Sequence, residues 1–195
     1  MNREENLNIN PGWEFSQSWL PTKPRPIDPI PAIEVTDLRG KRVIIGDSTT
    51  GWRKDLRADN TVDQSGKKFV PVLTELDYYR AELNGTRVLA PLIPIDKVWV
   101  ETPRDPSPSP PTNSEGPQRQ DPVPIRDHLR VTGQRIVLVT PNGEKRDLRA
   151  ISEPYIHDDG ELKIKICHEV NWYRWALTGK QPRFTSVPIF LSWIE

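Results

Sequence analysis

Short runs of apolar residues, many of them β-branched, recur along the chain at the length of β-strands. Arg42 to Gly46 and Arg135 to Thr140 are two such runs, and they have the composition of buried strands in small sheets. Pro141-Asn142-Gly143 follows the second run, and Asn-Gly favours a tight hairpin turn. We therefore expect the next strands at Trp52 to Ala58 and at Glu144 to Ala150.

An alternation of apolar and polar residues predicts a third strand in each half of the chain. Ile164 and Ile166 alternate with lysines, and Val70 and Val72 hold the matching positions in the first half. Pro71 lies within the first-half strand. Because proline cannot donate a hydrogen bond to a neighbouring strand, we expect an edge strand there.

A helix is expected after this strand in both halves. The apolar residues of this segment are spaced three and then four apart, as on one face of a helix: Leu76, Tyr79 and Leu83, and then Val170, Tyr173 and Leu177. Gly85 and Gly179 follow as expected C-terminal caps. Each half then closes with a strand through Trp99 or Trp193, and we expect both tryptophans in the core.

The two halves are similar enough to predict an internal duplication. Arg53 to Ala58 returns as Lys145 to Ala150, and Glu75 to Gly85 returns as Glu169 to Gly179. The closing residues Trp99-Val100-Glu101 return in the same way as Trp193-Ile194-Glu195. The breaks in the match fall in turn-like stretches, where insertions are tolerated best.

Together these patterns predict a mainly β protein made of two tandem duplicated units. Each unit would be a small antiparallel β-barrel or sandwich with one short helix, and an SH3-like barrel suits this order of elements. The units would span residues 33–101 and 125–195. Residues 1–32 would form an extended, proline-rich N-terminal arm, and residues 102–124 a proline-rich linker.

Proline sets the arm and the linker apart from the two units. The chain has 195 residues and 21 prolines, and most of the prolines lie in these two segments. Chain of this composition has little to bury and favours polyproline II or disorder. The linker would be either a flexible spacer or a strap that lies along the surface of a partner.

The arm also carries four large apolar residues: Trp13, Phe15, Trp19 and Leu20. Such side chains are costly to leave in water, and tryptophan often dominates protein interfaces. Either the arm packs back on its own barrel or it docks on another chain. In the second case these residues bind the partner, together with aromatic residues of the two expected helices: Tyr78, Trp172 and Trp175.

Charge and hydropathy exclude some classes of protein. The chain has 27 basic and 27 acidic residues and a net charge of +0, which lacks the basic excess of a typical nucleic-acid-binding face, although nucleic acid stays open as a partner. No apolar run approaches the roughly 18 residues that a membrane span needs, and Met1-Asn2-Arg3-Glu4-Glu5 lacks the apolar core of a signal peptide. We therefore expect no membrane insertion, and a location in the cytoplasm or in a virion.

Two clusters of reactive residues do not form a convincing catalytic or metal site. Cys167 and His168 are neighbours on an expected strand, so their side chains point to opposite faces rather than toward each other. His157-Asp158-Asp159 lies in a turn with no second cluster at metal-ligand spacing. The chain also has no glycine-rich phosphate loop and no nucleophile elbow. We expect no enzymatic activity, no metal and no cofactor.

Charged residues that recur in both halves are the remaining candidates. We expect them to form a structural ion-pair network between strand and helix: Asp55, Arg57, Glu75 and Arg80, and again Asp147, Arg149, Glu169 and Arg174. Arginine forms bidentate pairs well suited to this task. The alternative is a ligand groove between these arginines and the helix aromatics, which could bind a proline-rich peptide or stack a nucleic-acid base.

The combination of features favours a structural or assembly protein. Such a protein would clamp or bridge the protein subunits of a larger complex through its duplicated β-units and extended arms, as cement, decoration or linker proteins do, also in virions. The alternative is an adaptor that binds proline-rich peptide or single-stranded nucleic acid on the Tyr/Trp and Arg surfaces.

Overall fold

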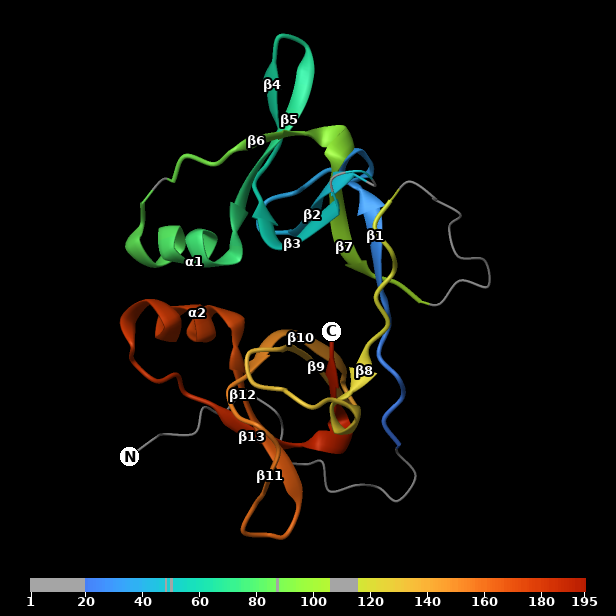
Figure 1. Ribbon diagram of the computed structural model, residues 1–195, viewed down its shortest axis with the longest axis vertical. Coiled ribbons are helices and arrows are strands. Elements are labelled where there is room, and N and C mark those ends of the chain that lie inside the picture. The colour runs from blue at the N-terminus through green and yellow to red at the C-terminus, as the bar shows by residue number, and fades with distance from the viewer. Residues whose placement is uncertain (1–19, 48, 50, 87, 106–115) are drawn as a thin grey trace. The chain divides into compact units, whose positions relative to one another are not determined.

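The chain folds into two curled antiparallel sheets, each a half-barrel accompanied by one helix (Figure 1). The computed structural model describes residues 20–47, 49, 51–86, 88–105 and 116–195. The contacts divide the chain into two compact units. The N-terminal unit is Arg25–Gln120, and the C-terminal unit is Asp121–Glu195 together with the described residues before Arg25. The prediction of a mainly β fold with two helices is confirmed.

The N-terminal unit contains a seven-stranded sheet of order β1-β7-β2-β3-β5-β4, with β6 paired to β5. Its elements are β1 (Ile27–Pro31), β2 (Arg42–Asp47), β3 (Gly51–Ala58), β4 (Val62–Gln64), β5 (Lys67–Thr74), α1 (Glu75–Asn84), β6 (Leu92–Pro94) and β7 (Val98–Pro103). Short 3-10 turns follow β1 and β6.

The C-terminal unit contains a second seven-stranded sheet, of order β8-β14-β9-β10-β12-β11, with β13 paired to β12. Its elements are β8 (Val123–Pro124), β9 (Arg135–Thr140), β10 (Gly143–Ala150), β11 (Tyr155–Ile156), β12 (Leu162–His168), α2 (Glu169–Thr178), β13 (Thr185–Pro188) and β14 (Ser192–Ile194). The two sheets thus have the same strand order, element by element, while their origin by duplication stays a prediction.

Each unit has its own apolar core inside the curl of its sheet. In the N-terminal unit the strands alternate, so that Val98 and Val100 of β7 enter the core while Trp99 between them faces the other side. Trp99 is nevertheless buried, because the ring of Trp52 packs edge-on against it, with 6.3 Å between the ring centroids. Trp193 is only half-buried. The expectation of a buried tryptophan is therefore confirmed for Trp99 and wrong for Trp193.

Pro71 does not mark an edge strand, because β5 pairs with β3, β4 and β6. The carbonyl of Pro71 accepts a hydrogen bond of 2.9 Å from the N–H of Asp59, where the chain leaves β3 on its way to β4. On the side of β5 that faces β3 and β4, Pro71 lies between the residues that pair with β4 and those that pair with β3. A strand can therefore hold a proline in mid-sheet where its missing N–H falls in a gap between two partners.

The structure also differs from the expected arm and linker at their inner ends. Residues 27–31, placed in the arm on sequence, form β1 and pair with β7, and Ala32 is fully buried in the core. On the linker side, Gln120 exchanges two backbone hydrogen bonds with Ile27. Proline-rich composition suggested extended chain, and the chain is extended here, but as a strand within the sheet.

The turn before β2 and β9 is held by one polar side chain in each unit. The carboxamide oxygen of Asn60 accepts hydrogen bonds from the backbone N–H groups of Leu38 and Arg39 at 3.2 and 3.3 Å. In the C-terminal unit the carboxylate of Glu153 accepts from Val131 and Thr132 at 3.0 and 3.1 Å. These hydrogen bonds, with that of Val131 the largest cause, hold the pKa of Glu153 below its ordinary value.

The lowered pKa of Glu153 predicts that acid weakens the turn of the C-terminal unit. Because the folded-state pKa of Glu153 is lowered, its contribution to stability is present above the unfolded-state pKa and is lost as the pH falls through the folded value. Glu153→Gln should therefore show a smaller loss of unfolding free energy than the wild type between neutral and acid pH. Urea unfolding at a series of pH values measures this.

The matched control is Asn60→Asp, which places a carboxylate in the equivalent turn of the N-terminal unit. It should add an acid-dependent loss of stability to that turn. Equal pH profiles for the wild type and Glu153→Gln would contradict the role given to the carboxylate.

Candidate functional site

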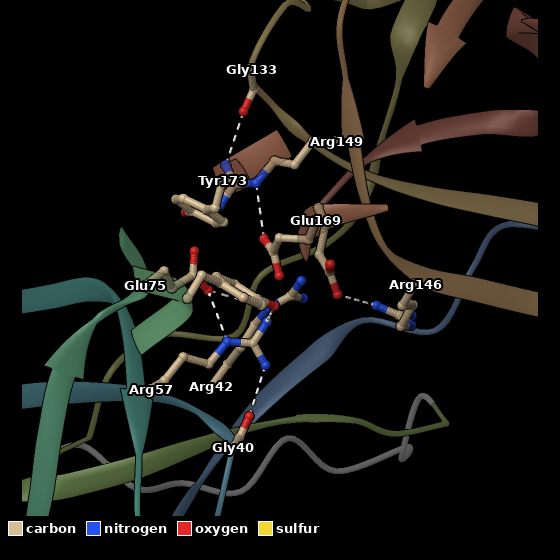
Figure 2. Close-up of polar contacts among 11 residues, drawn as sticks. Gly40, Arg42, Arg57, Glu75, Gly133, Arg146, Arg149, Glu169 and Tyr173 are labelled. Carbon is tan, nitrogen blue, oxygen red and sulfur yellow. Dashed lines mark hydrogen bonds and ion pairs between the residues drawn. The ribbon is translucent and has the colours of Figure 1, made fainter. Parts of the chain in front are cut away.

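A buried polar cluster joins helix, strand and turn in the N-terminal unit (Figure 2). Arg57 of β3 lies with its Nε 3.4 Å from Oε1 of Glu75, the first residue of α1. Its Nη1 donates to the carbonyl of Gly40 at 2.8 Å, and its Nη2 donates to the hydroxyl of Tyr79 at 3.0 Å. Both charged side chains are buried. One guanidinium therefore ties the helix to the strand and to the turn before β2.

The C-terminal unit contains the same cluster (Figure 2). Arg149 of β10 donates through Nε to Glu169 at 2.9 Å, through Nη1 to the carbonyl of Gly133 at 2.9 Å, and through Nη2 to the hydroxyl of Tyr173 at 3.0 Å. In each unit the guanidinium carbon also lies 5.5 Å from the centroid of the tyrosine ring. The five donors of an arginine suit this set of acceptors.

Arg42 is a member of the first cluster that the sequence analysis did not nominate. Its Nε lies 3.5 Å from Oε1 of Glu75, so this carboxylate stands between two guanidinium groups. The equivalent Arg135 is buried in the C-terminal unit. The sequence feature that could have identified Arg42 and Arg135 is an arginine at the start of an apolar strand, because it recurs in both halves.

The two aspartates assigned to the network do not follow the strand alternation on which that assignment rested. Asp55 and Asp147 are exposed and have positive φ angles of 60° and 58°, where the register of β3 and of β10 shifts. This bulge interrupts the alternation that would have put each aspartate on the face of the arginine two residues later. The strand-face argument for these two residues therefore does not apply.

Arg80 and Arg174 lie on the exposed side of their helices. Arg80 pairs with Asp77 at 2.8 Å, and Arg174 donates to Asn171 at 3.4 Å. A helix brings residues four apart onto one face, so Tyr79, and not Arg80, shares the face of Glu75. The spacing of Glu75 and Tyr79, repeated in the second half, was the signal that could have found the tyrosines.

The cluster compensates for the small apolar area that the helices bury. In α1 only Glu75 and Tyr79 are buried, and in α2 only Glu169 is. Leu76, expected on the apolar face of α1, is exposed. The position of each helix therefore depends on charged hydrogen bonds to its first turn, which are stronger than neutral ones.

The arginines of the cluster are also unsuited to bind phosphate. Arg57 and Arg149 are buried and already donate to a backbone carbonyl and to a tyrosine hydroxyl, beside their carboxylate partners. Recruiting them for a nucleic acid would break these hydrogen bonds and weaken the pairing of a buried carboxylate, Glu75 or Glu169, which is costly.

A groove opens in the N-terminal unit beside α1. Its volume is about 710 Å³, within the usual range of ligand sites. Residues of α1, of β6 and of the segment between them line one part of it: Tyr78, Ala81, Glu82, Thr86, Val88, Leu89, Ala90 and Leu92. The remaining lining comes from Arg39, Arg57, Ala58, Asp59, Asn60, Pro71 and Leu73.

The groove combines exposed apolar side chains with a few polar groups. Leu89 is 98% exposed, and Val88 and Leu92 are also exposed. The hydroxyl of Tyr78 donates to Glu82 at 3.0 Å. Burial of the ring, followed by this hydrogen bond, raises the pKa of Tyr78 above its ordinary value. Tyr78 therefore remains a neutral hydrogen-bonding group at neutral pH.

The other partner-binding residues proposed from sequence are spread over the chain. Trp172 and Trp175 pack edge-on against each other on α2, with ring centroids 5.4 Å apart, and both are half-buried. Leu20 is 82% exposed. Trp13, Phe15 and Trp19 lie outside the described residues.

Among the described residues, no three histidine, cysteine, aspartate or glutamate side chains gather as metal ligands. Within the same part of the chain, no helix has the length and apolar character needed to cross a membrane. No protein-family model, curated protein or solved structure matches the chain.

The cluster predicts a large difference between two arginines of the same unit. Arg57→Met removes one of the two guanidinium groups beside the buried Glu75, together with the connection from α1 to β3, so it should cost about 3 kcal/mol of unfolding free energy. Arg80→Met removes only an exposed i,i+3 pair and should cost under about 0.5 kcal/mol. Urea unfolding, followed by circular dichroism, measures both. Similar losses for the two variants would refute the pinning role of Arg57.

Proposed function

We propose that this chain is a non-enzymatic assembly protein that clamps or bridges protein subunits of a larger complex. Its two units are proposed to be duplicated copies of one small SH3-like barrel, and the N-terminal arm supplies further contacts. The larger complex would be a particle, such as a virion, in which this chain acts as a cement, decoration or linker protein. The partners would be folded protein subunits rather than a small molecule.

The groove beside α1 is the observation that supports this proposal most directly. Apolar side chains at its rim, Leu89 above all, are exposed to water. Apolar surface gathered around a hollow commonly marks a site of interaction. The helix that forms one wall is fixed to the sheet by Arg57 and Glu75, so a partner meets a preformed surface and little ordering cost is paid on binding.

The groove also favours protein over nucleic acid within the adaptor alternative. An extended peptide can place side chains along a groove that has Tyr78 and Pro71 in its lining. The burial of Arg57 and Arg149 removes two of the cations on which base-stacking and phosphate binding would rely. The adaptor alternative is therefore retained for a peptide that is rich in proline or aromatic residues.

A deletion that leaves the two units intact tests the role of the arm in assembly. Removing residues 1–19 leaves β1 and the segment before it, with Lys23 paired to Asp121, intact. We expect both units to stay folded and the complex with the partner to be lost, because Trp13, Phe15 and Trp19 would each bury roughly 150–250 Å² in an interface. Thermal unfolding and native mass spectrometry of the co-purified complex measure the two effects.

Two outcomes would count against this proposal. If the truncated chain melts at a much lower temperature, the arm belongs to the core of a unit. If the complex survives unchanged, the arm is not the clamp. A complex that dissociates steeply with added salt would instead support a nucleic-acid partner, since release of counterions makes such binding depend on salt.

A further inference from the structure

The groove of the N-terminal unit lies where the C-terminal unit has two large aromatic side chains. Ala81 and Trp175 hold the same place on α1 and α2 relative to Glu75 and Glu169. Ala90 and Phe184 hold the same place before β6 and β13, relative to Pro94 and Pro188. Both alanines line the groove. One unit therefore has aromatic rings where the other has small side chains beside an open hollow.

The aromatic residues of the C-terminal unit are packed within that unit. Phe184 is buried, and the ammonium of Lys165 lies 4.8 Å from the centroid of its ring. Trp175 packs against Trp172. In the N-terminal unit, Pro71 holds the place of Lys165 and lines the groove. The same frame thus accommodates aromatic rings at this position, and the N-terminal unit does not supply them itself.

We propose that the groove receives aromatic side chains of the segment Trp13–Trp19 from a second copy of this chain. The inference rests on the proposed assembly function and names the neighbouring subunit as another copy. The arm of one chain would supply to the N-terminal unit of the next what Trp175 and Phe184 supply within the C-terminal unit.

The segment has the chemistry that the groove lacks. It carries Trp13, Phe15 and Trp19 among the 19 residues that precede Leu20. Glu14 stands between the first two of these aromatics. In the groove, Arg39 has no ion pair or side-chain hydrogen bond with any residue that the structure describes. A carboxylate between two aromatic anchors is a suitable partner for this guanidinium.

The arm begins in a different unit from the one that carries the groove. The described residues just before Arg25 belong to the C-terminal unit, where Lys23 pairs with Asp121 at 3.4 Å and Pro24 is buried. The arm therefore departs from the unit that does not carry the groove. A contact between an arm and a groove joins two different surfaces, so it repeats from chain to chain as a ring or an open filament.

Two variants separate the donor surface from the acceptor surface. The groove-filled variant Ala81→Trp/Ala90→Phe gives the N-terminal unit the side chains that the C-terminal unit already has. The arm variant Trp13→Ser/Phe15→Ser/Trp19→Ser keeps the groove and removes the anchors. Sedimentation velocity of the full-length proteins, over a range of concentrations, measures self-association.

We expect the wild type to self-associate and each variant alone to lose at least tenfold in association constant. An equimolar mixture of the two variants should form a heterodimer, because an intact arm then meets an intact groove. The control Ala176→Trp adds an indole at an exposed position of α2 and should leave self-association unchanged within twofold.

Three results would overturn the inference: a monomeric wild type at all concentrations, a mixture that shows no heterodimer, or an equal loss of association in the control. If circular dichroism shows that the groove-filled variant is unfolded, Leu89→Glu replaces it, since this side chain is almost fully exposed. The assembly function is judged separately, by whether deleting residues 1–19 releases a different co-purified protein. A monomeric wild type whose complex with another protein needs the arm would refute this inference and leave the assembly proposal standing.

Discussion

The arrangement of each unit depends on one buried arginine that holds a helix by its first residue. Arg57 and Arg149 each join a β-strand to a glutamate at the start of the helix, to a tyrosine one turn later and to the carbonyl of a glycine turn. A helix of ten residues is marginal alone, and these two bury little apolar surface. The charged contacts therefore do what a broad apolar face does in other small folds. They fix the direction of the helix and the shape of the surface beside it, and they require that the guanidinium and the carboxylate remain shielded from water together.

Once the helix is fixed in the same way in both units, the surface beside it is free to differ. The C-terminal unit uses Trp175 and Phe184 there, and the N-terminal unit uses Ala81 and Ala90 and carries a groove. The turn before the second strand differs in the same manner, with an amide in one unit and a carboxylate in the other performing the same hydrogen bonding. One frame thus carries two unlike surfaces in a single chain without a change of fold.

The regular elements could be predicted from sequence because each has a period that burial imposes. The strands β2, β3, β5 and β7, their counterparts β9, β10, β12 and β14, both helices and the glycines that end the helices follow from apolar spacing and turn chemistry, whereas the shorter strands and β1 were not predicted. The errors arise where a neighbour far away in sequence decides the outcome. Pro71 is tolerated in mid-sheet by a gap between β3 and β4, and a positive φ at Asp55 rotates the strand face. The groove depends on the small side chain of Ala90 at the place where the C-terminal unit has Phe184. No periodicity of the sequence indicates such a difference, and only comparison of the two halves does.

The prolines of β1 have a consequence for how the sheet meets other molecules. Ile27 directs its N–H and carbonyl away from β7, toward Gln120. Pro29 and Pro31 follow at alternate positions of the strand, so their backbone faces the same outer edge of the sheet. Because proline has no N–H, neither residue offers a donor at this edge. Pro122 and Pro124 recur at the start of the second sheet, and at the far side β4 and β11 are only three and two residues long. Neither sheet therefore presents a long row of free donors and acceptors onto which a further strand could add. Many copies of the chain can then be concentrated in one place without merging their sheets, and contacts between molecules are left to side chains.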